Sequence, residues 1–386
     1  MTENFPRGST AVAGVATYGI DGKHGMQPME LAGKAALMAL GEAGMTPAEI
    51  DGFFIALPPT EDAMSGLWGA EYLGINPRVT SNNRVGGSSF QSMAIAAALA
   101  LDAGMCDAAL ICYGSNQRSS TGKLITSSRP FRYESVYRPV APASAYALAA
   151  SRHMHEYGTT RRQLAEVAVA ARGWANLNPE AYSQGELTID DVLGARIVSS
   201  PLGKHDCCLV TDGAAAAVMV RADRARDLQQ TPVYLLGGAE ATTHRWISQM
   251  PDLTTSATAQ CAPRAYAQAG VCPEDVDVVE LYDAFTINTI MMLEDMGFCA
   301  KGEGGAFVED GAIAPGGRLP VNTMGGGLSY CHPGMFGMFT LVEAVRQLRG
   351  GCGDRQVQGA EIALSHGNGG SLSHQGVLVL GGASTV

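Results

Sequence analysis

The stretch Ala39-Leu-Gly-Glu-Ala-Gly-Met-Thr-Pro-Ala-Glu-Ile-Asp51 has a second copy in this chain, Ala265-Tyr-Ala-Gln-Ala-Gly-Val-Cys-Pro-Glu-Asp-Val-Asp277. In both copies an alanine-rich helix is predicted to end at a glycine, and a proline then opens a short turn. An apolar strand follows each turn, over residues 52–57 and 278–282. The chain therefore repeats one unit of helix and strand.

A second pair of similar segments supports this repeat. Ala109-Leu-Ile-Cys-Tyr-Gly-Ser115 and Ile362-Ala-Leu-Ser-His-Gly-Asn368 are each an apolar strand that ends in an aromatic residue or histidine followed by glycine. Two similar α/β layers are expected, with the apolar helices over 89–103 and 335–348 sandwiched between their sheets.

The repeat also predicts how the chain is divided. Residues 1–116 and 211–228 are expected to form the N-terminal half, and residues 229–386 the C-terminal half. Residues 117–210 between them are richer in Arg, Tyr and Ser. We predict that this range is an inserted loop domain that lies across the site and decides specificity.

Composition limits the classes of function. Charged residues make up 16% of the 386 residues, against a usual share of about 25%, so a homodimer that buries extra surface is expected, with the strand in 107–113 near an edge. The net charge of −11 and the lack of a basic run argue against nucleic-acid binding. Residues 362–386 carry no charge but are interrupted by Gly-Asn-Gly-Gly, which predicts strand, loop and strand and no membrane span.

The ends and the cysteines suggest a cellular location. The first eight residues show no signal peptide, so a cytoplasmic protein is expected. The nine cysteines are then expected to be reduced, and they form no paired C-x-x-C pattern for zinc. No metal site is predicted.

Five short motifs carry a resemblance to a known family. They are Asn83-Arg-Val-Gly-Gly-Ser-Ser89, His205-Asp-Cys-Cys-Leu-Val-Thr-Asp-Gly-Ala-Ala215, Glu280-Leu-Tyr-Asp-Ala-Phe-Thr286, Gly325-Gly-Gly-Leu-Ser-Tyr-Cys-His-Pro-Gly334 and Ser365-His-Gly-Asn-Gly-Gly370. In their order and spacing the chain resembles the thiolase superfamily over nearly its whole length. The resemblance implies a duplicated thiolase-like fold of five layers, α-β-α-β-α. It also implies coenzyme A as part of the substrate and no permanently bound cofactor.

The chain departs from the thiolase pattern at three positions. Gly86 stands where thiolases have the nucleophilic cysteine, Tyr282 replaces an asparagine or histidine, and His366 replaces the second cysteine. His332 matches the histidine that thiolases keep. The resemblance thus argues against a covalent acyl-enzyme, whereas two histidines and a tyrosine can move protons near neutral pH.

These departures are similar to the thiolase-like aldol lyases of steroid side-chain catabolism. Those enzymes cleave a β-hydroxyacyl-CoA without a covalent intermediate, and they work with a partner built from a zinc ribbon and an oligonucleotide-fold barrel. By this resemblance Tyr282 takes the β-hydroxyl proton, His332 helps to form an oxyanion site for the enolate, and His366 protonates Cα.

The same resemblance implies further site residues. Gly86, Gly87 and Gly367 are expected to offer backbone groups to the oxyanion site. Tyr330 is a candidate for a second tyrosine that the lyases place near position 331.

Two other functions remain open. The first is an acyltransferase or thiolase that uses Cys331 or Ser88 as nucleophile, although the sequence shows no base paired with Ser88. The second is a non-catalytic scaffold subunit that binds lipids or CoA esters. Detection of an acyl adduct separates the first from the lyase, and product analysis separates the second.

Overall fold

The computed structural model describes residues 5–21, 25–58, 64–122 and 133–386. The strands are β1 (Thr10–Tyr18), β2 (Gly52–Ala56), β3 (Val79–Ser81), β4 (Ala108–Ser115), β5 (Ile197–Ser199), β6 (Leu202–Gly203), β7 (Gly213–Arg221), β8 (Val233–Thr242), β9 (Val278–Glu280), β10 (Ile362–Gly369) and β11 (His374–Gly381). The helices are α1 (Pro28–Ala43), α2 (Ser65–Leu73), α3 (Ser89–Asp102), α4 (Gln117–Thr121), α5 (Ala143–Tyr157), α6 (Arg161–Asn176), α7 (Ile189–Gly194), α8 (Ala222–Ala225), α9 (Thr258–Ala269), α10 (Thr286–Asp295), α11 (Gly304–Phe307) and α12 (Gly337–Leu348).

The predicted repeat is visible in the sheet. Within the described residues nine strands form one continuous sheet in the order β3-β2-β4-β7-β1-β8-β11-β10-β9. The order β2-β4-β7-β1 in the first half is matched by β9-β10-β11-β8 in the second, with one parallel pair followed by antiparallel pairs in each. The halves meet where β1 pairs with β8, at Ala11 with Tyr234 and Val12 with Val233.

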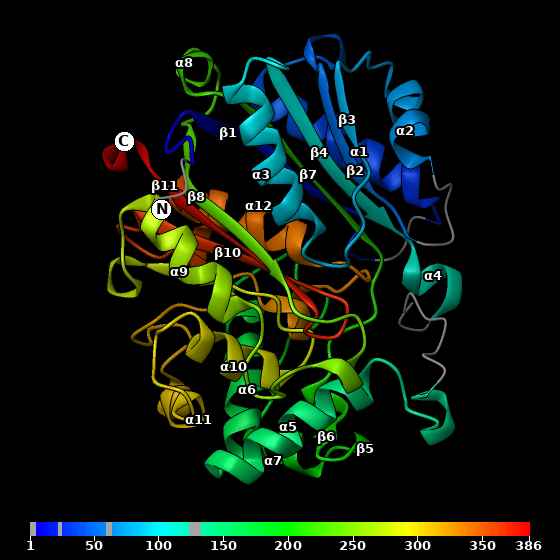
Figure 1. Cartoon of the computed structure of the whole chain (residues 1–386), viewed down its shortest axis with the longest axis vertical. Helices are drawn as coiled ribbons and strands as arrows, with labels where there is room; N and C mark the ends of the chain where they lie inside the picture. The colour runs from blue at the N-terminus through cyan, green and yellow to red at the C-terminus, as the bar shows by residue number, and fades with distance from the viewer. Residues whose placement is uncertain (1–4, 22–24, 59–63, 123–132) are drawn as a thin grey trace.

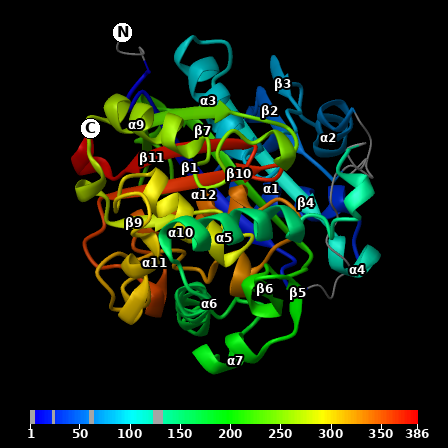
Figure 2. The same ribbon diagram turned by 60° about the horizontal axis from the view of Figure 1, so that its bottom comes forward.

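The helices cover this sheet in layers, as expected for the five-layer class. Helices α3 and α12 lie in the middle and contact strands of both halves, α1 packs on β1, β4 and β7, and α9 packs on β8 and β11. Figures 1 and 2 show α3 and α12 between the blue-green and the orange-red strands. The apolar helices that the sequence predicts in the centre are therefore confirmed.

The two copies of the repeated stretch also end alike. Helix α1 stops at Gly44 with φ 71°, and α9 stops at Gly270 with φ 70°. Both glycines adopt the left-handed conformation that closes a helix without a Cβ penalty. A short 3-10 turn that begins at Pro47 or Pro273 then leads into β2 or β9.

Residues 117–210 fall between β4 and β7. Of this range, residues 123–132 lie outside the described residues. The described part forms α4 to α7 and the β5–β6 hairpin, and most of it lies below the layered body in Figure 1. In the second half, residues 370–373 alone join β10 to β11. Residues 362–381 thus form the strand, loop and strand that the sequence predicts, and no helix in the described ranges is long and apolar enough to cross a membrane.

One expectation about the sheet is wrong. The strand in residues 107–113 was expected near an edge, but β4 lies between β2 and β7 and pairs with both. The end of the sheet on this side is β3, which pairs with β2. A strand that is apolar on both faces is typical of the middle of a layered sheet, so its composition fits this central position better.

Candidate active site

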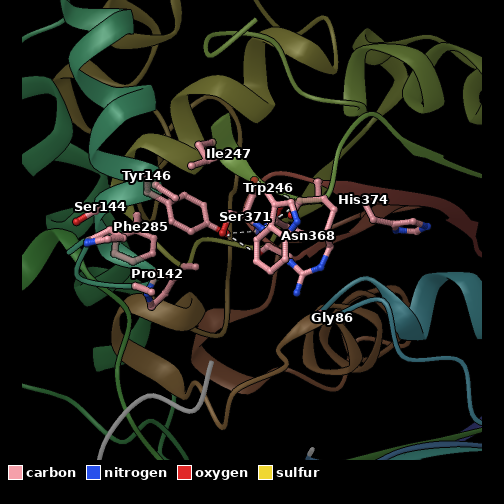
Figure 3. A pocket seen from close by; sticks show the side chains of 18 of the residues that line it. Gly86, Pro142, Ser144, Tyr146, Trp246, Ile247, Phe285, Asn368, Ser371 and His374 are labelled. Carbon is pink, nitrogen blue, oxygen red and sulfur yellow. Dashed lines mark hydrogen bonds between the residues drawn. The ribbon is translucent and has the colours of Figure 1, made fainter. Parts of the chain in front are cut away.

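A cavity of about 1780 Å³ opens at the carboxyl ends of the strands. Its walls include residues at or just after the ends of β2, β4, β8, β9 and β10, namely Pro58, Ser115, Thr242, Tyr282 and Asn368. The wall also includes the start of α5, residues 84–87, residues 244–249 and residues 332–335. Figure 3 shows side chains from these segments converging on one space. Ligands of α/β sheets bind at this end of the strands.

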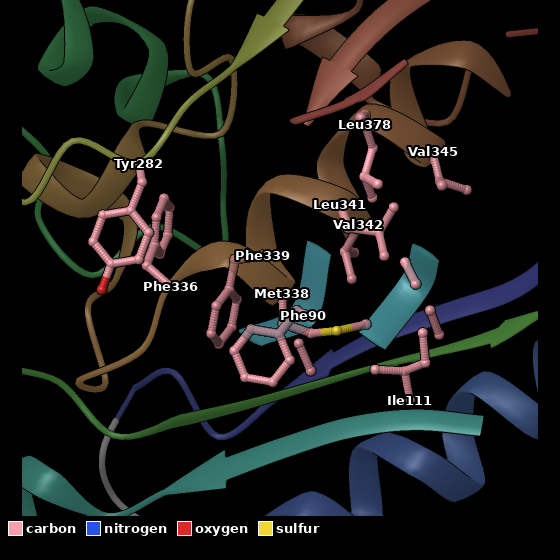
Figure 4. Close-up of a cluster of buried hydrophobic side chains, with 14 of the residues drawn as sticks. Phe90, Ile111, Tyr282, Phe336, Met338, Phe339, Leu341, Val342, Val345 and Leu378 are labelled. Atoms are coloured by element: carbon pink, nitrogen blue, oxygen red, sulfur yellow. The ribbon is translucent and has the colours of Figure 1, made fainter. Parts of the chain in front are cut away.

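The structure brings two of the predicted catalytic residues together. The Tyr282 hydroxyl lies 3.0 Å from His332 Nε2, and their rings meet edge to face with centroids 5.5 Å apart. Tyr282 also packs edge to face on Phe336, at 5.7 Å. Figure 4 shows Tyr282 and Phe336 at the end of a buried apolar cluster from α3 and α12. A rigid core therefore supports a tyrosine–histidine pair that lines the cavity.

Burial sets the protonation of this pair. Desolvation lowers the pKa of His332 to about 4 and raises the pKa of Tyr282 well above its usual value. A neutral imidazole and a neutral phenol therefore face each other at pH 7. Among the described residues His332 Nδ1 has no hydrogen-bond partner. In the tautomer that carries its hydrogen on Nδ1, Nε2 can receive the phenolic proton of Tyr282.

The residue after Tyr282 holds the turn that carries His332. Asp283 Oδ1 accepts a hydrogen bond from the amide of Gly327 at 2.6 Å. Gly326 has φ 63°, and a Cβ on it would overlap the Asp283 carboxylate. Burial raises the pKa of Asp283 to about 7. The glycine-rich motif and the Tyr-Asp-Ala-Phe motif therefore occur together because one carboxyl group connects them.

The motif at 205–215 fixes the same turn from the other side. The amides of Cys208 and Leu209 donate to the carbonyls of Ala284 and Gly327, at 2.8 and 2.9 Å. The Thr211 hydroxyl accepts from the amide of His332 at 3.0 Å. This segment thus supports the backbone on both sides of the pair.

No side chain fits where thiolases carry their cysteine. A Cβ on Gly86, which has φ 99°, would lie 2.7 Å from the Gly370 nitrogen and 2.8 Å from Gly369 Cα. A Cβ on Gly87 would overlap the Tyr282 ring. Both glycines line the cavity at the start of α3. Tyr282 therefore occupies space that a residue-87 side chain would need.

His366 does not face the cavity. It is fully buried, and its Nδ1 accepts a hydrogen bond from the amide of Tyr282 at 3.3 Å. Its Nε2 then carries the proton and donates to Gln375 Oε1 at 2.9 Å. Desolvation lowers its pKa to about 4. Both ring nitrogens of His366 are thus bonded within the protein. Neither can reach a substrate, so His366 cannot protonate Cα as the sequence predicts.

Three further predicted residues lie away from the cavity wall. The Tyr330 hydroxyl donates to Glu180 Oε2 at 3.1 Å, on the side of a separate small pocket. Cys331 is fully buried, and burial together with Glu180 and Asp283 raises its pKa well above the usual thiol value. A Cβ on Gly367 would overlap Gln91 of α3, so this glycine serves close packing there.

Ser88 has a partner that the sequence does not reveal. Its hydroxyl lies 2.8 Å from His374 Nδ1, and His374 Nε2 lies 3.6 Å from Glu240 Oε2. His374 lines the cavity, whereas Ser88 is fully buried behind Gly86 and Gly87. No sequence spacing points to this group, because its members come from the residue before α3, from β11 and from β8.

Two further polar residues of the cavity, Tyr146 on α5 and Asn368 at the end of β10, have no role predicted from the sequence. Both line the cavity, and the Asn368 amide nitrogen donates to the Tyr146 hydroxyl at 2.8 Å. Asn368 stands in a quoted motif, but Tyr146 lies in the 117–210 range, where no motif marks it. Across the described ranges, no group of three or more His, Cys, Asp or Glu side chains could hold a metal ion.

The chain is similar in sequence to known proteins. Residues 239–382 match the family described as Thiolase C-terminal domain-like. The chain is 35% identical to the 17-hydroxy-3-oxo-4-pregnene-20-carboxyl-CoA lyase of Mycobacterium tuberculosis, over 89% of this chain and 92% of the relative. It is 44% identical to an acetyl-CoA acetyltransferase of Methanothermobacter thermautotrophicus, over 59% of this chain and 60% of that protein.

A solved structure is similar over almost the whole length. The structure described as "Ltp2-ChsH2(DUF35) aldolase" superposes with a TM-score of 0.88 and 31% identity, and the match covers 97% of this chain and 98% of that one.

Proposed function

The chain belongs to the thiolase superfamily, and from this premise we propose that it is a carbon–carbon lyase that cleaves a β-hydroxyacyl-CoA by a non-covalent retro-aldol reaction. Its relatives include a CoA-thioester lyase and an aldolase. One observation in the structure carries the proposal. The Tyr282–His332 pair stands beside Gly86 and Gly87, where backbone and the tyrosine ring leave no room for a thiol.

The pair accounts for the first proton transfer. A tyrosine alone is a poor base at pH 7, because its pKa near 10 keeps the phenol protonated. Neutral His332 accepts the Tyr282 proton at 3.0 Å while the phenolic oxygen takes the β-hydroxyl proton of the substrate. This replaces the oxyanion role predicted for His332, because its Nε2 is already directed at Tyr282.

Loss of the hydroxyl proton breaks the Cα–Cβ bond, and the electron pair moves into the enolate of the thioester. The enolate oxygen then faces Gly86 and Gly87, which line the cavity just before α3 begins at Ser89. The helix dipole favours negative charge at this end. General acid–base catalysis contributes about 10²–10⁴-fold, and a backbone oxyanion site of this kind about 10²–10³-fold.

The cavity also fits the two ends of a CoA thioester. Arg84, Arg138 and Arg245 line it and offer positive charge to phosphate groups. The apolar side chains of Phe285 and Ile247 line another part, where an acyl group would pack. A compound such as the 17-hydroxy-3-oxo-4-pregnene-20-carboxyl-CoA named for the relative is a β-hydroxyacyl thioester, and it serves as the probe below.

No acyl-enzyme is expected during turnover. Incubation with the probe or with acetyl-CoA should leave the intact mass of the protein unchanged, since no thiol or hydroxyl stands at position 86 or 87. Intact-mass spectrometry after acid quenching checks this. An acyl adduct mapped to Ser88, Ser89, Cys208 or Cys331 that forms as fast as turnover would overturn the lyase.

The same measurement tests a second candidate, an acyltransferase. Ser88, His374 and Glu240 follow one another as hydroxyl, imidazole and carboxylate, the arrangement that activates a serine nucleophile. The acetyltransferase relative supports this second candidate. The lyase is preferred because Ser88 is fully buried. A scaffold subunit that only binds CoA esters predicts neither adduct nor cleavage.

A protein partner belongs to the proposal as well. The similar aldolase structure is described with a second component, ChsH2(DUF35). We expect this chain to work with a small protein of that type, built from a zinc ribbon and an oligonucleotide-fold barrel, and activity tests below use the chain together with such a partner.

A homodimer is the expected assembly of the chain itself. Strand β3 ends the sheet on one side, and Leu67 and Tyr72 of the adjacent α2 are 63% and 51% exposed. An unpaired edge beside apolar side chains favours pairing with a second copy. Light scattering at micromolar concentration should give twice the chain mass of 40.2 kDa. Replacing Leu67 and Tyr72 by lysine should shift the measured mass toward that of the monomer. A monomeric wild-type chain would contradict this.

A further inference from the structure

Tyr146 places a second phenol in the cavity, from the 117–210 range. It is 2% exposed, and its ring stacks on Phe285 with centroids 4.3 Å apart and planes at 24°. Figure 3 shows its hydroxyl directed toward Asn368 and Ser371. Phe285 lies three residues after Tyr282, so one loop positions both tyrosine rings.

A directed chain of hydrogen bonds orients this hydroxyl. His366 Nε2 donates to Gln375 Oε1 at 2.9 Å, and Gln375 Nε2 donates to Asn368 Oδ1 at 2.7 Å. Asn368 Nδ2 then donates to Tyr146 Oη at 2.8 Å, and the phenolic proton points to the Gly370 carbonyl at 3.2 Å. Each donor in the chain is fixed by the one before it. A phenolate at Tyr146 would keep the hydrogen bond from Asn368, which stabilises the charged form.

Asn368 also connects the two tyrosines in space. A Cβ on Gly87 would overlap the Tyr282 ring and would lie 2.7 Å from the Asn368 carbonyl oxygen. The backbone of Asn368 therefore adjoins Tyr282, and its side chain holds Tyr146. The two phenols and the backbone at Gly87 surround one region of the cavity, where an enolate formed by Tyr282 would lie.

Resting on the proposed function, we propose that Tyr146 is the catalytic acid that protonates Cα of the enolate. The Cα–Cβ electron pair forms the enolate as Cβ becomes a ketone or aldehyde, and the β-hydroxyl proton moves through Tyr282 to His332. Cα then takes the phenolic proton of Tyr146. The imidazolium proton of His332 returns to the Tyr146 phenolate through water in the open cavity, so no proton is gained or lost over the cycle.

In this scheme His366 and Gln375 are positioning residues. They act through Asn368 and do not touch substrate, which explains a histidine whose two nitrogens are both bonded within the protein. The sequence predicts that His366 protonates Cα, and in this scheme Tyr146, at the other end of the hydrogen-bond chain, does so instead.

The test compares Tyr146→Phe with Tyr282→Phe, because each keeps its ring and removes only a hydroxyl. Tyr157→Phe is the matched control, since Tyr157 lies on the same helix α5, is 38% exposed and does not line the cavity. Two rates are measured in D₂O with the partner present: cleavage of the probe thioester, and deuterium exchange at Cα of propionyl-CoA. Melting temperatures confirm that the variants fold.

Tyr146→Phe is expected to slow both rates on the order of 100-fold, the usual loss for a general acid. Tyr282→Phe should slow cleavage alone and retain exchange, and Tyr157→Phe should change neither. Exchange requires the phenolate, and burial raises the pKa of Tyr146 to about 12. Wild-type exchange should therefore rise steadily between about pH 7 and 9, and Tyr146→Phe should lose this rise.

The contrary outcomes separate the two proposals. Cleavage by the wild type together with unchanged exchange in Tyr146→Phe would overturn the role of Tyr146 and leave the lyase standing. Loss of exchange in Tyr282→Phe but not in Tyr146→Phe would reverse the two roles. A wild-type protein that neither cleaves the probe nor exchanges propionyl-CoA would overturn the lyase and this inference with it.

Discussion

Replacing His332 by alanine is expected to lower kcat for cleavage of the β-hydroxyacyl-CoA probe by on the order of 100-fold or more. Without the imidazole, the Tyr282 proton has no acceptor at 3.0 Å, and the phenol cannot take the β-hydroxyl proton. KM should change much less, because the pair is proposed to act on the hydroxyl and not to hold coenzyme A.

Steady-state kinetics checks this, with His155→Ala as control, since His155 is exposed on α5.

The pH profile of wild-type kcat adds a second readout. His332 has a pKa of about 4, so it is neutral above that value and its base form is lost as the pH falls through it. Wild-type kcat should therefore stay flat down to about pH 5. A His332→Ala protein as active as the wild type would place the base elsewhere.

Gly87→Ala is expected to have an effect of similar size. The new methyl group would overlap the Tyr282 ring, and overpacking of this kind costs about 1–3 kcal/mol of stability. The ring must move away from His332, so kcat for cleavage should fall on the order of 100-fold, the usual cost of losing an acid–base group.

Gly41→Ala in α1 is the matched control, because a Cβ there meets nothing within 4 Å. It should leave activity unchanged and raise stability slightly, as glycine is a poor helix former. Thermal unfolding and kinetics of both variants are compared. Full activity in Gly87→Ala would show that Tyr282 need not stay where the structure has it.

The fold could be predicted because its pattern repeats along the chain. Two alanine-rich helices with glycine ends, each followed by a proline turn and an apolar strand, required two copies of one layer. The edge of the sheet could not be predicted in this way, because no repeated segment corresponds to the short strand β3 that ends it.

At the site, side-chain direction decided what the sequence could and could not reveal. Ser365 and Gly367 on β10 face Thr340 of α12 and Gln91 of α3. Since successive side chains of a strand point to opposite faces, His366 faces Thr258 of α9 instead. Its motif predicted a functional histidine, but His366 lies two residues before the cavity-lining Asn368, further from the carboxyl end of β10, and both of its ring nitrogens are bonded within the protein.

Tyr330 was expected in the site but does not line the cavity, whereas Tyr146 was not expected there and lines it. Tyr330 stands two residues before His332 but belongs to a π-helical turn, and its hydroxyl points to Glu180. Tyr146 lies more than a hundred residues earlier in an unmarked helix, and only the folded chain brings it to Asn368. Contacts between distant segments carry no signal in a single sequence.

Cleavage of the probe thioester in D₂O, followed by mass analysis of both products, tests the central claim most directly. A retro-aldol lyase predicts a free ketone and propionyl-CoA that carries at least one deuterium at Cα, with no acyl adduct on the protein. Transfer of an acyl group to a second thiol, with no ketone released and no deuterium at Cα, would contradict the account.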